Sequence, residues 1–251
     1  MKLHIFSLPI LLSFVISPAL YAQFEGEIEY RIYNPAEIEN KEKSLSLTFT
    51  KDRLFIQSDD NVDVMNGVST NGILIRSDLQ DFVLLTSPDE AVKVAKSDLD
   101  GLVSMMNRFR ESPEKTENKP FEWDEKVIET GRIRTLNGYR TKEFTLMGGE
   151  DYDIISVWLT DEIKADWGLL MQTWYDTGVT ELGENIPVEL VMNKNSFPLL
   201  VEVIKENRII FSAEATNVNN TSFDRSVTEV SDSIKLLSFS DVMMNMFRQR
   251  K

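Results

Sequence analysis

Apolar and polar residues alternate along most of the chain, as they do in β-strands that have one buried and one solvated face. In residues 24–33, Phe24, Ile28 and Tyr30 share one side of a predicted strand, and glutamates occupy the other side. Similar alternation or short apolar runs predict further strands at 45–50, 54–58, 72–77, 81–86, 91–96, 127–136, 139–146, 153–160, 186–193, 197–206 and 208–218. The short polar connections between them predict a mainly antiparallel sheet.

The pair of residues 51–52 predicts a hairpin with a defined register. If this pair is a two-residue loop, Phe49 lies opposite Leu54 and Leu47 lies opposite Ile56. Both strands then bury their apolar residues on one face, which sets the register of the pair.

The Asn137-Gly138 pair predicts a second hairpin, because both residues accept positive φ angles at low cost. A two-residue loop at this point gives three cross-strand pairs: Leu136–Tyr139, Arg134–Thr141 and Arg132–Glu143. We expect the last pair to be a favourable cross-strand charge pair that contributes less than ~1 kcal/mol. Gly131 is expected to mark a bulge. The apolar residues do not separate onto one face, which indicates strong twist or a sheet edge.

Apolar residues recur at spacings of three and four in three other segments, and this period predicts amphipathic helices. The first helix runs over 97–109 with Ser97 or Asp98 as its N-cap, and the second runs over 160–174 with Thr160 as its N-cap. The third covers 238–248, and the polar segment 112–120 is expected to be a loop. The predicted fold is an α+β domain over residues 23–251, with amphipathic helices packed on the sheet.

Residues 1–22 have the layout of a secretory signal peptide: Lys2, an apolar core and small residues up to Ala22. We expect cleavage after Ala22, with an uncleaved membrane anchor as the alternative. The chain has no cysteine, which excludes a lipid-anchored lipoprotein. No later stretch is apolar enough to cross a bilayer, so the expected location is periplasmic or extracellular.

Charge and composition exclude several classes of function. The formal net charge is −14, which disfavours binding to nucleic acid and to anionic membrane surfaces. The single histidine is His4, within the predicted signal peptide, and there is no thiol. Nucleophilic systems that use Ser-His-Asp or Cys-His, and the ordinary zinc, copper and iron sites, are therefore not expected. We expect no cofactor and no enzymatic activity.

Methionines and tryptophans are the candidate ligand-binding residues. Met-rich helices repack easily around apolar ligands, and tryptophans can line an apolar cavity. The candidates are Met105, Met106, Trp158, Trp167 and Trp174. The alternative interpretation, which remains open, is that these side chains are ordinary core.

Two acidic patterns are candidates for a calcium site and for a catalytic carboxylate pair. Asp59, Asn61 and Asp63 alternate as in a calcium loop, but Val64 and Thr70 occupy the positions at which an EF-hand needs glycine and glutamate. A polar loop between strands is therefore favoured. Glutamates at 25, 27 and 29, and the acids at 122 and 124, alternate along strands. Each set is expected to be a solvated face, because catalytic carboxylate pairs usually come from different segments.

Several motifs together resemble one family of exported bacterial proteins, those classed as domain of unknown function 4412. The motifs are FEGEIEY at 24–30, TGRIRTLNGYRTKEFTL at 130–146, VWLTDEI at 157–163, PLLVEVI at 198–204 and RIIFSAEATNV at 208–218. The resemblance implies a curved antiparallel sheet shaped as a half-open β-barrel with helices in its hollow. That arrangement is similar to the periplasmic lipoprotein carriers LolA and LolB.

These observations lead to three hypotheses. The first is an exported, non-enzymatic protein of the cell envelope that binds or carries a lipid-like ligand. The second is an interaction or assembly component of the envelope without a small-molecule ligand. The third is a hydrolase that uses two carboxylates. A hollow between the sheet and the helical segments 99–109 and 163–174 would favour the first hypothesis.

Overall fold

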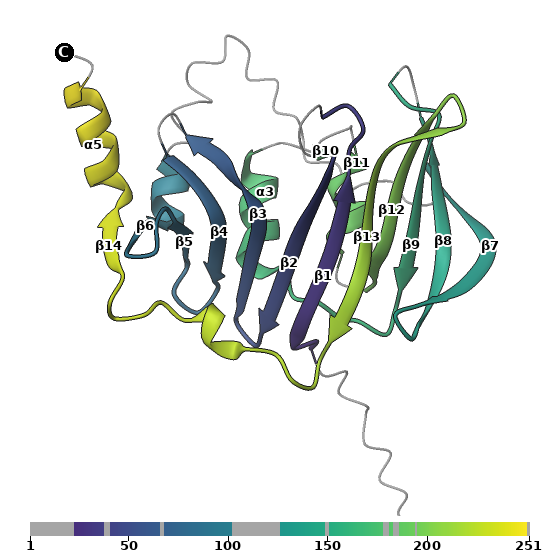
Figure 1. The fold of residues 1–251 in the computed structure, drawn as a ribbon, viewed down its shortest axis with the longest axis horizontal. Coiled ribbons are helices and arrows are strands. Elements are labelled where there is room, and N and C mark those ends of the chain that lie inside the picture. The colour runs from purple at the N-terminus through teal and green to yellow at the C-terminus, as the bar shows by residue number, and fades with distance from the viewer. Residues whose placement is uncertain are drawn as a thin grey trace, which may run out of the picture.

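The computed structural model describes residues 23–37, 41–65, 68–101, 126–148, 151–177, 181–182, 186–193 and 195–249. Twelve strands form one sheet in the order β14-β6-β5-β4-β3-β2-β1-β13-β12-β9-β8-β7 (Figure 1). The strands are β1 Gly26–Tyr33, β2 Glu42–Thr50, β3 Arg53–Met65, β4 Val68–Arg76, β5 Asp81–Leu85, β6 Glu90–Ala95, β7 Val127–Leu136, β8 Tyr139–Met147, β9 Ile154–Thr160, β12 Phe197–Lys205, β13 Arg208–Asn219 and β14 Lys235–Ser238. A separate two-stranded pair joins β10 Glu181–Leu182 to β11 Ile186–Pro187.

The fold is mostly β, with few short helices, rather than the α+β class that was predicted. Its described helices are α3 Gly168–Thr177, α4 Val188–Val191, the 3₁₀ turn η2 Arg225–Thr228, α5 Phe239–Gln249 and the helical residues 96–101. The sheet is largely antiparallel, as expected, but β14 pairs with β6 in parallel. It is not closed, because β14 and β7 are its two ends. In the described part of the chain, no helix is both long and apolar enough to span a membrane.

Both predicted hairpin registers are confirmed. Phe49 pairs with Leu54 across the first hairpin, and Leu136 pairs with Tyr139 across the second. Gly131 has φ +76° and lies where the register between β7 and β8 shifts, so it marks the expected bulge. β7 is an end strand, which explains why its apolar residues do not gather on one face.

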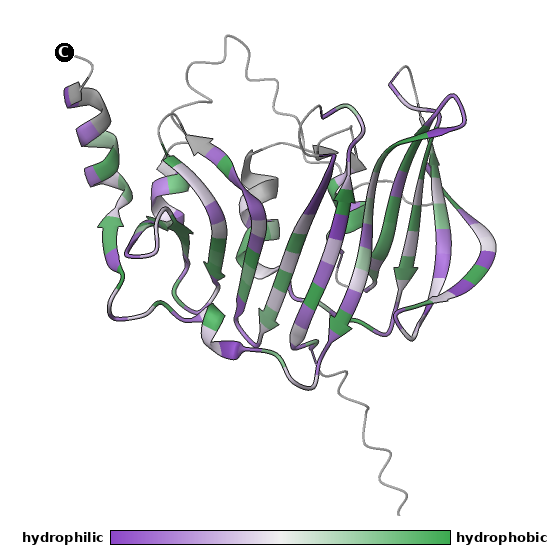
Figure 2. Ribbon diagram, in the orientation of Figure 1, coloured by the Kyte–Doolittle hydropathy of each residue, from purple (hydrophilic) through white to green (hydrophobic). Residues whose placement is uncertain are grey.

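The inner face of the sheet, which we define as the face covered by residues 163–169, α3 and α4, holds most of the core. An aromatic cluster lies at its centre: Phe49 makes edge-to-face contacts with Trp167 at 5.5 Å and with Phe197 at 6.0 Å between ring centroids. Trp167 stacks on Phe197 at 5.6 Å. Toward β8, Leu190 of α4 packs with Val157 and other buried residues of β9 and β12. Apolar and polar residues alternate along many of the strands, because successive side chains point to opposite faces and one face is buried (Figure 2).

At one end of the sheet, the opposite, outer face is covered by the C-terminal segment. Phe55, Leu74 and Val83 point to this face and pack with Val227 and Val230. The segment that carries these valines includes η2 and runs toward β14 (Figure 1). Because both faces are covered here, β5 is buried over almost its whole length.

The predicted helix 160–174 begins later than expected, at Gly168. The Thr160 hydroxyl accepts from the amide of Glu162 at 3.2 Å in a local turn and does not cap a helix. Asp166 Oδ1 accepts from the amide of Gly168 at 2.8 Å, and Gly168 has φ +43°. Ile163 and Trp167 are buried, but they belong to an extended segment that crosses the sheet.

Two strand-or-loop predictions were wrong. The predicted strand 186–193 is β11 followed by the helix α4, because a short apolar run does not distinguish a strand from a buried helix. Residues 59–63 were expected to be a polar loop, but they continue β3. Val62 and Asp63 pair with Thr70 and Ser69 of β4, and Asp59 Oδ2 accepts from the amide of Ser44 on β2 at 2.9 Å.

The first predicted helix begins at residue 96, and the part beyond residue 101 lies outside the described residues. Asp98 Oδ2 accepts from the amide of Ala95 at 3.1 Å. Asp98 is therefore the third residue of the first turn and reaches back to the residue before the helix, as in a capping box. Neither Ser97 nor Asp98 is the N-cap. The expected loop 112–120 and the acids at 122 and 124 also lie outside the described residues. The third helix is confirmed as α5.

Candidate functional site

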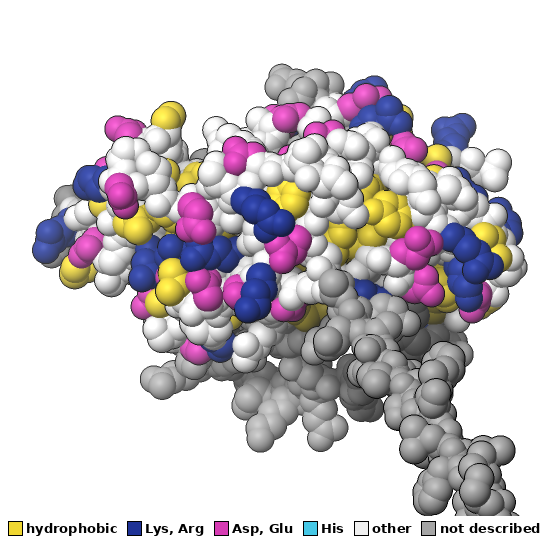
Figure 3. All heavy atoms as spheres, turned by 90° about the horizontal axis from the view of Figure 1, so that it is seen from below, with side chains coloured by type: hydrophobic (Ala, Val, Ile, Leu, Met, Phe, Trp, Pro, Cys, Tyr) yellow, Lys and Arg dark blue, Asp and Glu magenta, His cyan; other side chains and the backbone are white. Residues whose placement is uncertain are grey.

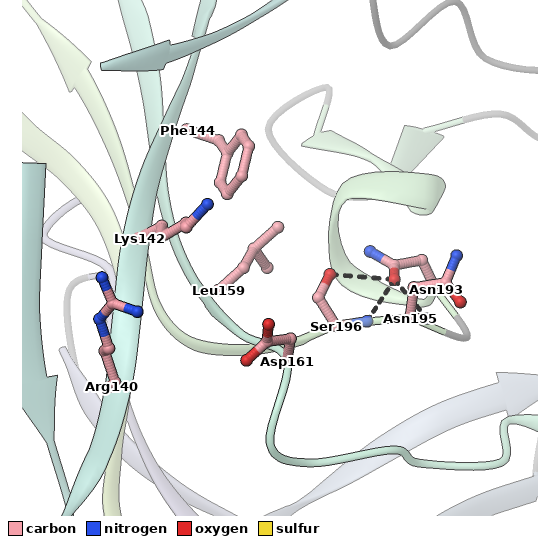
Figure 4. Close-up of a pocket in the computed structure, with 8 residues that line it drawn as sticks. All are labelled: Arg140, Lys142, Phe144, Leu159, Asp161, Asn193, Asn195 and Ser196. Atoms are coloured by element: carbon pink, nitrogen blue, oxygen red, sulfur yellow. Dashed lines mark hydrogen bonds between the residues drawn. The ribbon is translucent and has the colours of Figure 1, made fainter. Parts of the chain in front are cut away.

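A pocket of about 400 Å³ lies between β8 and the loop that connects α4 to β12 (Figure 4). Its described lining comes from β8, β9 and two loops, and consists of Arg140, Lys142, Phe144, Leu159, Asp161, Asn193, Asn195 and Ser196. The volume lies within the range of about 300–1,000 Å³ that is typical of small-molecule sites.

Strand periodicity places three of these side chains in one row. Arg140, Lys142 and Phe144 are alternate residues of β8, so they project from the same face of the strand (Figure 4). Lys142 pairs with Leu159 of β9 across the sheet. Phe144 and Leu159 form an apolar floor, and the two basic side chains stand along one edge of it.

The opposite wall is held rigid by hydrogen bonds around Asn193. Its Oδ1 accepts from the amides of Asn195 at 2.9 Å and Ser196 at 2.7 Å, and from the Ser196 hydroxyl at 3.0 Å. Lys164 Nζ donates to the carbonyl of Asn195. The Asn193 side-chain oxygen is therefore used in hydrogen bonds within the loop, whereas the side chain of Asn195 is exposed at the rim of the pocket.

Two basic side chains line the pocket of an otherwise acidic protein. Lys142 Nζ lies 2.9 Å from Glu129 Oε1, so its charge is partly neutralised. The guanidinium of Arg140 has no hydrogen-bond or ion-pair partner among the described residues, and only the Arg140 amide is engaged, donating to Glu162 Oε1 at 3.0 Å. Asp161 is the single carboxylate among the described lining residues. An unpaired guanidinium above an apolar floor suits an anion with an apolar body.

A second group of charges lies on the outer face, behind the same strand. Glu143 is buried, with 2% of its surface exposed, and its carboxylate is held by Arg132, whose Nε donates to Oε2 at 2.5 Å. Thr130 Oγ1 donates to Oε2 at 2.7 Å and Ser156 Oγ donates to Oε1 at 2.9 Å. Burial raises the pKa of Glu143, but these hydrogen bonds outweigh it and hold the pKa below its usual value. The predicted Arg132–Glu143 pair therefore exists, and its acid is buried.

Two further residues complete this outer cluster. The guanidinium carbon of Arg134 lies 3.9 Å from the ring centroid of Trp158, and the buried Arg134 Nε has no hydrogen-bond partner among the residues that the structure describes. Burial raises the pKa of Glu202, and the charges of Glu143 and Glu214 act in the same direction. The charged groups of this cluster contact one another on the outer face of the sheet, so we assign them a structural role rather than a ligand-binding one.

A more open hollow of about 570 Å³ lies at the end of the sheet near η2. Its centre is Arg53, whose Nη2 lies 2.9 Å from Asp78 Oδ2 and whose Nη1 lies 2.5 Å from Glu229 Oε2. Arg225 pairs with Glu25 close by. Figure 3 views this end of the sheet and shows basic and acidic side chains interspersed on it. The charges are paired with one another, so this hollow is a junction between the C-terminal segment and the sheet.

The predicted ligand-binding residues do not form one site. Trp158 lies on the outer face under Arg134. Trp167 lies in the aromatic cluster of the inner face, and its buried Nε1 has no hydrogen-bond partner in the described part of the chain. Trp174 is in α3, but its side chain is not described, and Met105 and Met106 lie outside the described residues. No group of three or more potential metal-binding side chains was found among the described residues.

Sequence reasoning missed the pocket residues. The available signal was the row of two basic residues and one aromatic residue at alternate positions of 140–144. From the sequence alone, these residues belong to the hairpin around Asn137-Gly138. Asn193 of the opposite wall, some 50 residues later, ends the predicted strand 186–193.

The fold and site together define a protein built on one open, largely antiparallel sheet. The chain matches no family model, and no curated protein matches it. Its resemblance to the domain of unknown function 4412 family therefore stays a prediction.

Solved structures show distant similarity of shape. Two structures of PNGF-II are 14% and 12% identical, each with a TM-score of 0.39, and the match covers 90% of this chain but 34% and 33% of theirs. A DUF1329 family protein from Desulfovibrio piger is 12% identical with a TM-score of 0.27, and the match covers 81% of this chain and 88% of that one. The chain thus spans about a third of the length of PNGF-II. Similarity at this level carries no functional argument.

Proposed function

We propose that the protein is an exported, non-enzymatic binding protein of the cell envelope, and that it holds an anionic amphiphile in the pocket beside β8. The observation that carries this proposal is the position of Arg140. Its guanidinium stands at the edge of a floor made by Phe144 and Leu159 and has no ion-pair partner among the described residues. Export rests on the signal-peptide pattern of residues 1–22.

The chemistry of the pocket supports this class of ligand. Burying an alkyl chain on the apolar floor contributes about 0.8 kcal/mol for each CH₂ group removed from water. Arg140 can bind a carboxylate or phosphate with two parallel hydrogen bonds, which are stronger than neutral ones. Because the whole chain carries −14, distant charges repel an anion, and this local pair of cations is what favours it.

The ligand position differs from the one expected of a half-open barrel carrier. In such carriers the acyl chain lies in the hollow between sheet and helices. Here Phe49, Trp167 and Phe197 pack together in the middle of the inner face, so the proposed ligand lies beside them, toward β8. A non-enzymatic role is favoured because the described pocket lining has one carboxylate, whereas the hydrolytic hypothesis needs a pair.

Calorimetric titration with decanoate tests the proposal, with decanol and acetate as partial ligands. We expect decanoate to bind, decanol to bind more weakly and acetate not to bind. Arg140→Gln is expected to weaken decanoate binding about tenfold, which corresponds to ~1.4 kcal/mol. The matched control is Arg208→Gln, another exposed arginine, on β13 and outside the pocket lining. Equal affinity of the two variants, or no binding of decanoate to the unaltered protein, would refute the proposed ligand class.

Export is tested separately by fractionating cells that produce the full chain. We expect a mature protein that lacks residues 1–22 in the periplasm or the medium. An unprocessed chain in the cytoplasm would refute export, and an unprocessed chain in the membrane fraction would refute cleavage. Neither result bears on the ligand proposal.

A further inference from the structure

The free edge of the sheet at β7 is unusually long and apolar for an end strand. β7 has 10 residues, and in the described part of the chain it pairs with β8 alone. End strands normally avoid new pairing through charges, bulges or short length. The bulge at Gly131 is one such device, yet Ile128 is 55% exposed and Ile133 is 50% exposed.

These two isoleucines project from opposite faces of the edge. Ile133 pairs with Lys142, which points into the pocket on the inner face, whereas Ile128 pairs with Thr145, which alternates with the outer-face residue Glu143. A strand added beside β7 would therefore find an apolar neighbour on each face. Its main chain would meet the N–H and C=O groups on the side of β7 that faces away from β8, where no strand pairs with β7 in the described part of the chain.

The charge of this edge selects the partner. Residues 126–147, which contain the β7–β8 hairpin, include five basic and two acidic residues, although the chain as a whole carries −14. Arg132 on β7 is 66% exposed even though it is bonded to Glu143. A strand that approaches this edge gains if its own side chains are acidic.

We propose that the edge of β7 binds an extended, acidic segment of a partner protein, which adds a strand to the sheet. The acidic side chains of that segment lie on the outer face near Arg132, and its apolar side chains lie on the inner face near Ile133. A second copy of this chain fits less well through the same edge, because each copy brings its own basic hairpin. The inference does not depend on the pocket or on its ligand.

The test uses a peptide of about seven residues that alternates glutamate with valine, and a second peptide that replaces glutamate with lysine. Binding is followed by fluorescence anisotropy of labelled peptides at low and high salt. We expect the acidic peptide to bind, to weaken at high salt and to lose binding when alternate amides are N-methylated. The lysine peptide is expected not to bind at about 1 mM.

Ile133→Glu should weaken binding of the acidic peptide at least about tenfold. Ile209→Glu is the matched control, because Ile209 is also exposed, at 43%, but lies on β13. Ile128→Glu is a second variant in case Ile133→Glu does not fold, and circular dichroism confirms the fold of each. Equal binding of both peptides, or equal loss in Ile133→Glu and Ile209→Glu, overturns the proposal. A dimer of the unaltered protein that Ile133→Glu dissociates also overturns it, because the occupant is then a second copy.

Discussion

Removing the guanidinium of Arg132 tests whether the outer cluster stabilises the sheet. Arg132→Ala leaves Glu143 buried, with 3% of its side chain exposed, and held only by the hydroxyls of Thr130 and Ser156. Removing one partner of a fully buried ion pair costs about 3–5 kcal/mol, and removing one from an exposed pair costs ~0.2–1 kcal/mol. Arg132 is 66% exposed and two donors remain, so we expect a loss between these limits, of about 2 kcal/mol. For a chain of this size, that lowers Tm by roughly 4–8 °C.

The assay is urea denaturation followed by circular dichroism, with Arg31→Ala as the control. Arg31 pairs with Glu214 at 2.6 Å, but these side chains are 55% and 41% exposed. We expect Arg31→Ala to cost under ~1 kcal/mol. Adding Glu143→Gln to Arg132→Ala should recover part of the loss, because it removes the unpaired buried charge. The reasoning is refuted if both arginine variants lose the same free energy of unfolding, or if the added Glu143→Gln lowers stability further.

The pH dependence of Arg132→Ala has a definite sign. Hydrogen bonds hold the pKa of Glu143 below its usual value in the folded state. The stability that Glu143 contributes is therefore present above its unfolded pKa and is lost as the pH falls through the depressed folded pKa. The difference between Arg132→Ala and the unaltered protein should accordingly shrink in acid.

Two further predictions concern the core and the outer face. Phe49→Ala should lower the free energy of unfolding by about 3–5 kcal/mol, because Phe49 is fully buried against Trp167 and Phe197. Urea denaturation checks it against Leu79→Ala at a position that is 52% exposed; similar losses would contradict the packing. In the unaltered protein, the free energy of unfolding should fall as the pH rises through the raised pKa of Glu202, because the charged carboxylate is less stable in the folded state than in the unfolded chain. Glu202→Gln should remove this part of the pH dependence. Unfolding measured between about pH 4 and 8 checks this, and unchanged pH profiles would argue against a buried carboxyl.

The strands were predictable because their signals are local. The apolar alternation of the strands around 51–52 sets one register, and the turn chemistry of Asn137-Gly138 sets the other; both registers are observed. The helix at 160–174 was misjudged because Ile163 and Trp167 also have helical spacing, although they are buried from an extended segment. The residues of β14 were not predicted as a strand, because its four residues carry little pattern and pair with β6, about 145 positions earlier along the chain.

The candidate site was less predictable, because its two walls are distant in the sequence. Alternation shows that Arg140, Lys142 and Phe144 share a face, but not what lies opposite them. The loop at 193–196 reaches the pocket only because α4 replaces a strand at 188–191. The burial of Glu143 could not be predicted from the sequence either. It depends on the bulge at Gly131, which places Thr130 and Arg132 within hydrogen-bonding distance of the carboxylate.

The outer cluster and the pocket are linked through the geometry of β8. Glu143 lies between Lys142 and Phe144 in the sequence, so its side chain points to the outer face when theirs point into the pocket. A slip of the β8 register by one residue would move all three side chains to the opposite face of the sheet. Phe144 would then leave the apolar floor, and Lys142 would move to the face on which Glu143 is now buried. The hydrogen bonds of Glu143 to Thr130 on β7 and Ser156 on β9 hold it from both neighbouring strands and oppose such a slip. The buried acid therefore keeps the register that aims the basic row at the proposed ligand, although it does not line the pocket.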